Sequence, residues 1–151
     1  MAKNNFSLDF DGFLDLAADL DNLGNGYLKK AVDNAFTASK DYANNAVAEA
    51  MSKSRYHFDR GQKYSKGKAK ASLNKVSNMP VEWNGSTASA YIGVSLKDAL
   101  EIQFLIYGTP HIQADTNLRN AIKVKGKYKK EVSKIQLEEF NKVIEEALNN
   151  G

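Results

Sequence analysis

The sequence feature that most constrains the fold is a long helical period that begins near Tyr27. Apolar residues recur there at spacings of three and four, which places them on one face of a helix. They are Leu28, Val32, Ala35, Phe36, Ala43, Ala46, Val47 and Ala50. Because that face is mostly alanine, whatever covers it can approach closely. We expect the helix to fray between Met51 and Tyr56, where the charge pattern changes.

A shorter amphipathic helix is expected before the long one. Asp11 is a typical N-cap residue, and apolar residues follow it at helical spacing as far as Leu20. The sequence Gly24-Asn25-Gly26 then breaks the helix. The N-terminal part of the chain is therefore predicted to be helical.

Short β-like runs follow residue 70, at residues 71–76, 81–83 and 88–94. Asn84-Gly85, between the last two runs, is a hairpin signal because both residues readily adopt the left-handed backbone of a tight turn. The pattern predicts a small antiparallel sheet of about three strands.

The C-terminal third is expected to return to helix. Residues 96–107 fit a helical face, although their last part also fits a buried strand, and we favour a helix that runs into a short extended end. Asp115 is placed to cap a short helix. In the last amphipathic helix, the capping-box pattern of Ser133 and Gln136 favours a start at Ser133 for the strong part.

Composition indicates one soluble domain. The 151 residues are 42% hydrophobic and 26% charged, with no cysteine, so stability must come from packing rather than from disulfides or thiolate metal sites. We expect no signal peptide and no membrane span. The predicted fold is a single α+β domain over residues 1–151: N-terminal helices with one long helix, a small antiparallel sheet and a C-terminal helix.

Charge is segregated along the chain. Residues 1–52 carry 4 lysines against 8 acidic residues, whereas residues 53–75 carry 8 basic residues against Asp59 alone. The basic residues are Lys53, Arg55, Arg60, Lys63, Lys66, Lys68, Lys70 and Lys75. Because residues 56–70 contain two glycines and few apolar anchors, we expect a basic mobile loop there. It would face DNA or an acidic protein partner, or it is simply a solvated loop.

The sequence favours no catalytic chemistry. His57 and His111 are the only histidines and lie in no metal-ligand pattern. Paired acids are expected on solvated helix faces, where nothing raises their pKa for general acid catalysis. We therefore predict no enzyme activity, no metal and no cofactor.

The run Phe104-Leu105-Ile106-Tyr107-Gly108-Thr109 is apolar and partly aromatic, and it is followed by Leu118-Arg119-Asn120-Ala121. Gly108 is best able to turn the backbone at positive φ, and Pro110 bars a simple continuation. We expect a packed element to end there. The predicted core comprises Trp83, Ile92, Phe104, Leu105, Leu118 and Phe140.

These two segments resemble the tail-completion, or head–tail joining, family of long-tailed (siphovirus-type) bacteriophages, which includes relatives of the lambda minor tail protein Z. Family members typically carry an aromatic, an aliphatic, a glutamate, an aromatic and Gly-Thr, and then Ala-Arg-Pro-Phe-Leu-Arg-Pro-Ala before a terminal helix. The matching residues are Phe104, Leu105, Tyr107, Gly108 and Thr109 in the first half, and Ala114, Leu118, Arg119 and Ala121 in the second. The order of elements also fits, from about Phe10 to Leu148.

The chain departs from the family pattern at Ile106, which stands in place of glutamate, and at Asp115, Thr116 and Asn120, which stand in place of arginine or proline. These changes put a charge-based role of the motif in doubt and leave its packing or subunit-contact role. The resemblance implies a structural virion protein at the head–tail junction, made in the host cytoplasm. Its implied partners are further copies in a ring, neighbouring neck and tail proteins, and phage DNA in the channel, with no membrane. A tail terminator that caps the tail tube is the alternative, and a small nucleic-acid-binding protein acting through residues 53–75 is a second.

Overall fold

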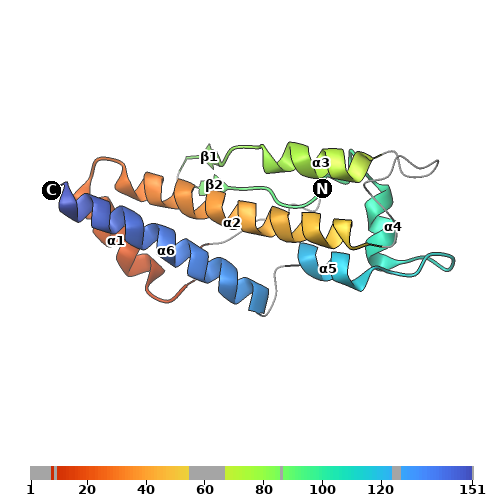
Figure 1. The fold of residues 1–151 in the computed structure, drawn as a ribbon. Helices are drawn as coiled ribbons and strands as arrows, with labels where there is room; N and C mark the ends of the chain where they lie inside the picture. The colour runs from red at the N-terminus through yellow and green to blue at the C-terminus, as the bar shows by residue number, and fades with distance from the viewer. Residues whose placement is uncertain (1–7, 9, 55–66, 86, 124–126, 151) are drawn as a thin grey trace.

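The computed structural model describes residues 8, 10–54, 67–85, 87–123 and 127–150. Within these residues the chain forms six α-helices and one two-stranded antiparallel sheet (Figure 1). In chain order they are α1 (Phe13–Leu23), α2 (Tyr27–Ser52), α3 (Lys68–Ser77), β1 (Glu82–Asn84), β2 (Thr87–Ser89), α4 (Glu101–Tyr107), α5 (Thr116–Ile122) and α6 (Lys127–Asn149). The predicted α+β class is confirmed, with two strands described where about three were expected.

Helix α2 is the long helix that the sequence predicts, and it runs the length of the molecule (Figure 1). Its 26 residues span about 39 Å at 1.5 Å per residue. Its alanine face is buried, and α6 packs against it in the antiparallel direction. The direction is fixed by two contacts: Lys30 pairs with Glu146 near the end of α6, and Tyr42 stacks on Tyr128 near its start.

Two hydrophobic clusters lie along α2. The first surrounds its N-terminal half and joins α1, α2, α6 and the hairpin; Phe10, Phe13 and Phe140 meet edge to face in it, with ring centroids 5.3 to 5.6 Å apart. The second surrounds its C-terminal half and joins α3, α4 and α5 through residues such as Leu73 and Ile102. The two ends of the molecule are therefore built on separate sets of side chains.

The hairpin predicted near Asn84-Gly85 is confirmed, with Trp83 opposite Ala88, but its turn begins one residue later than expected. Asn84 is the last residue of β1 and pairs with Thr87, and only Gly85 of the two has a positive φ, 62°. Trp83 ties the hairpin to α2, because its indole Nε1 donates a hydrogen bond of 2.6 Å to Asp33 Oδ1. The chain is no longer a strand after Ser89, so the expected run over residues 88–94 is mostly wrong.

The strand predicted over residues 71–76 is also wrong, because these residues lie in α3. Helix α3 buries apolar residues at spacings of four and three: Ala69, Leu73 and Val76. This spacing fits one face of a helix, whereas a strand would bury every second residue. Gly67 precedes α3 with a φ of 68°. The prediction of a basic loop over residues 56–70 is therefore wrong for residues 68–70, which already belong to α3. Residues 56–66 lie outside the described part of the chain.

The C-terminal helices follow the prediction with three corrections. Helix α4 begins at Glu101, so residues 96–100 of the expected helix lie before it and are not helical. It stays helical through Tyr107 and has no extended end. Asp115 caps α5 as expected, since its side chain accepts a hydrogen bond from the Leu118 N–H. Helix α6 begins at Lys127 rather than at Ser133, because its first turns already place apolar groups against α2.

Candidate interaction surface

Helix α4 carries most of the motif and has apolar side chains on two opposite faces. Ile102 and Ile106 are 1% and 8% exposed and belong to the second cluster. Leu100, at the N-cap position, and Phe104 and Tyr107 are 55%, 47% and 61% exposed. At 3.6 residues per turn these three lie within about 60° of one another around the helix axis. We call them the α4 apolar face.

The prediction that Phe104 is buried is wrong for a geometric reason. A helix of seven residues can turn only one side toward the second cluster, and Ile102 and Ile106 occupy that side. The other predicted core residues are Ile92, Leu118 and Phe140, which are buried, and Trp83 and Leu105, which are half-buried. The sequence therefore predicted that a packed element ends here, but it placed Phe104 in the core rather than on the exposed side of α4.

The Gly108-Thr109 pair of the motif forms a tight turn. Gly108 has a φ of 77°, and a Cβ at this position would lie 2.9 Å from the Ile112 carbonyl oxygen and 3.0 Å from the Ala114 nitrogen. The Thr109 hydroxyl oxygen accepts hydrogen bonds from the backbone N–H groups of His111 and Ile112, at 3.2 and 3.0 Å. The pair thus reverses the chain after α4 and holds the face in place.

The second half of the motif lies on α5, beneath α4. Leu118 is buried in the second cluster, and Asp115 is held by a 2.6 Å hydrogen bond from the Ser54 hydroxyl at the end of α2. Arg119 is half-buried. Lys123, at the C-cap of α5, lies 5.8 Å from the centre of the Tyr107 ring and places a cation beside the α4 apolar face.

The structure places half of the predicted basic residues at this same end of the molecule. Lys53, Lys68, Lys70 and Lys75 are described, whereas Arg55, Arg60, Lys63 and Lys66 lie outside the described residues. Lys53 forms an ion pair with Glu49, and Lys75 forms one with Asp98 at 3.3 Å. Helix α3 carries three lysines and no acidic residue, so the side of this end that α3 forms is positive.

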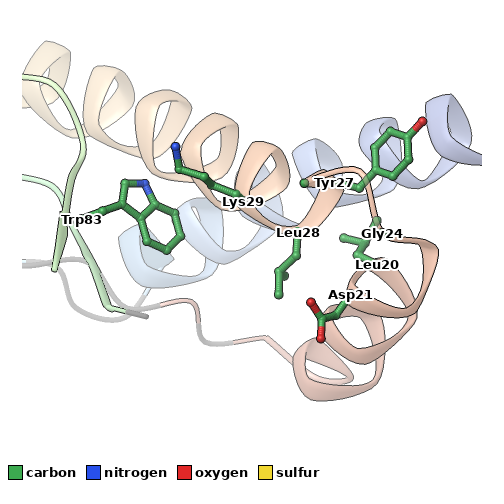
Figure 2. Close-up of a pocket in the computed structure, with 8 residues that line it drawn as sticks. Leu20, Asp21, Gly24, Tyr27, Leu28, Lys29 and Trp83 are labelled. Carbon is green, nitrogen blue, oxygen red and sulfur yellow. The ribbon is translucent and has the colours of Figure 1, made fainter. Parts of the chain in front are cut away.

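A cavity of about 260 Å³ lies at the other end, between the C-terminal end of α1, the first turn of α2 and the hairpin (Figure 2). In Figure 2 Trp83 comes from the hairpin, Leu28 from α2, and Leu20 and Asp21 from α1. Lys29 lies 5.8 Å from the centre of the Trp83 ring. Residues far apart in the chain line this cavity, so the sequence alone does not predict it.

The described residues contain no group of histidine, cysteine, aspartate or glutamate that could hold a metal ion. Burial, and then the nearby Tyr42, raises the pKa of Tyr128 to about 12, which is a feature of the α2–α6 contact rather than of a catalytic cleft. None of the described helices is both long and apolar enough to cross a membrane.

Comparisons of the chain with family models, curated proteins and solved structures gave no match.

Proposed function

We propose that this chain is a structural virion protein of a long-tailed phage that acts at the head–tail junction, where it completes the tail end and helps to join tail to head. The observation that carries the proposal is the α4 apolar face. The segment that resembles the tail-completion family ends in a rigid turn and exposes its two aromatic rings, Phe104 and Tyr107. An exposed aromatic cluster on a rigid element is typical of a protein contact.

The mechanism is complementarity of surfaces rather than chemistry. The domain would form a ring with further copies, cover the end of the tail tube and offer a platform to the neck protein on the head side. Burying the α4 apolar face would contribute roughly 25 cal/mol for each Å² of apolar surface removed from water. The positive side formed by α3 would then lie near phage DNA or an acidic neighbouring protein.

The tail terminator alternative predicts a different defect. If the chain caps the tail tube, its loss should leave tube growth unstopped and give tails of uneven length. If the chain completes the tail end, its loss should give tails of normal length that do not join heads. Electron microscopy of a phage lacking this gene therefore separates the two roles. We expect full heads and unjoined tails of normal length, and normal virions would overturn both.

A matched pair of variants tests the surface itself. Phe104→Asp places a charge in the α4 apolar face, while Leu14→Asp changes a leucine of α1 that is also exposed. In a joining assay with heads and tails from the mutant phage, we expect purified wild-type and Leu14→Asp protein to restore infectious particles and Phe104→Asp to lose at least about 30-fold, the loss typical of a central aromatic contact. Equal activity of the two variants would remove the basis of the proposal.

The nucleic-acid-binding alternative is supported by the three lysines of α3, which no acidic residue of the same helix offsets. It predicts DNA binding by the free chain that weakens steeply with salt. A triple variant, Lys68→Gln, Lys70→Gln and Lys75→Gln, should then abolish DNA binding. If joining survives in that variant, the lysines do not serve the head–tail junction.

A further inference from the structure

Each end of this molecule presents apolar surface that a single copy leaves uncovered: exposed side chains at one end and an open cavity at the other. The α4 apolar face is a group of exposed side chains at the C-terminal end of α2. The cavity lined by Leu20, Leu28 and Trp83 is a concave surface at the N-terminal end of α2. Leu28 and Met51, which mark the two ends, are roughly 35 Å apart along the helix. One copy therefore cannot bring its own α4 apolar face to its own cavity.

The charges at the two ends are complementary. Helix α1, which borders the cavity, carries Asp15, Asp19 and Asp21 and no basic residue, so this end has an acidic excess although Lys29 of α2 also lines the cavity. Helix α3, whose Ala69 and Leu73 belong to the same second cluster as Ile102 of α4, carries three lysines and no acidic residue, and one of these lysines, Lys75, pairs with Asp98. Lys123 adds a cation next to Tyr107. Two like ends would repel each other, whereas the acidic end of one copy attracts the basic end of another.

We propose that copies of this chain associate head to tail, with the α4 apolar face of one copy docked on the cavity between α1, α2 and the hairpin of the next. The cavity, at about 260 Å³, is smaller than most small-molecule sites, which start at roughly 300 Å³, and suits one inserted aromatic side chain better than a drug-sized ligand. Phe104 or Tyr107 is that side chain, and Leu28 and Trp83 are its apolar neighbours.

This contact is heterologous, because each copy contributes two different surfaces. A heterologous contact produces a closed ring if its rotation closes and an open filament if it does not. The inference rests on the proposed function only for the biological use of the ring. The contact itself belongs to the purified chain and is tested without phage, so its failure is distinguishable from a failure in head–tail joining.

The absence of cysteine makes the test clean, because every thiol is introduced on purpose. Gln103→Cys borders the α4 apolar face without removing a member of it, and Lys29→Cys stands at the cavity; both positions are exposed. Asn45→Cys, at an exposed site about two thirds of the way along α2, is the control. Circular dichroism and thermal unfolding would establish that each variant is folded.

Under mild oxidation, an equimolar mixture of Gln103→Cys and Lys29→Cys should form a disulfide dimer at least about tenfold faster than either variant mixed with Asn45→Cys. The double variant should form a ladder of covalent oligomers. Adding Phe104→Gln to the Gln103→Cys chain should slow the cross-link at least about tenfold, as expected when a central aromatic contact is lost. A Gln103→Cys chain that dimerises with itself as fast as the mixture, or a mixture no faster than the control, would overturn the inference.

Discussion

Gly108→Ala is expected to be among the most destabilising single changes in this chain, and the structure separates its two causes. The first is the backbone. Gly108 ends α4 with φ 77° and ψ 169°, a region that is nearly restricted to glycine and costs other residues roughly 1 to 3 kcal/mol. The second is contact, because the new Cβ would lie 2.9 Å from the Ile112 carbonyl oxygen and 3.0 Å from the Ala114 nitrogen. Both are backbone atoms of the turn, so neither can move aside cheaply.

Gly24→Ala is the matched control. Gly24 ends α1 with φ 69° and ψ −155°, close to the conformation of Gly108, but a Cβ there meets nothing within 4 Å. Gly24→Ala should therefore lose about 1 to 3 kcal/mol, the backbone cost alone. Gly108→Ala should lose roughly 1 to 2 kcal/mol more, since the turn must shift a few tenths of an ångström at several backbone atoms.

Urea unfolding followed by circular dichroism measures both changes, with the free energy of unfolding compared at equal m values. A domain of this size is typically stable by about 5 to 15 kcal/mol, so both variants should remain folded at low temperature. If Gly108→Ala is no less stable than Gly24→Ala, the turn after α4 is not rigid. The Gly108-Thr109 turn would then not be what holds the α4 apolar face in place.

Three further predictions concern individual side chains. Phe104→Ala should lower the free energy of unfolding by less than about 1 kcal/mol because the ring is half exposed, whereas Phe140→Ala, fully buried, should lower it by about 3 to 5 kcal/mol; equal losses in urea unfolding would contradict this. Tyr128→Phe should raise stability by about 1 kcal/mol, since the Tyr128 hydroxyl is buried without a hydrogen-bond partner, and a loss would show that the hydroxyl is satisfied. Burial raises the pKa of Tyr128 to about 12, so the folded chain keeps a proton that the unfolded chain loses above about pH 10. The free energy of unfolding should therefore fall as the pH rises from 10 to 12. It should fall less in Tyr128→Phe, which has no hydroxyl to titrate.

The sequence predicted the parts of the fold that a local pattern determines. The long helix follows from an apolar face repeated along its length. The hairpin follows from Gly85, which adopts the positive φ that a tight turn needs, although Asn84 pairs within β1 instead of joining the turn. The cap of α5 follows from Asp115, whose side chain bonds to a backbone N–H only three residues away. Each of these signals needs no partner element to be correct.

The errors arose where a partner element decides the structure. The segment 71–76 is short and mixed in character, so its pattern fits a strand as well as a helix until Leu73 packs in the second cluster with Val47 and Met51 of α2. The cavity could not be predicted at all, since Leu20, Leu28 and Trp83 come from three elements. In both cases the missing information was the distance between segments, which a single sequence does not contain.

Helix α4 shows a third kind of limit, in which the pattern was correct and its interpretation was not. A short helix with apolar side chains on two opposite faces is expected to bury both of them. Here the fold buries Ile102 and Ile106 and leaves Leu100, Phe104 and Tyr107 in water. The fold of one copy thus accounts for only half of the apolar character of α4. The exposed half of this apolar character is explained if the surface of another copy covers it. We propose the cavity at the far end of α2 as that surface.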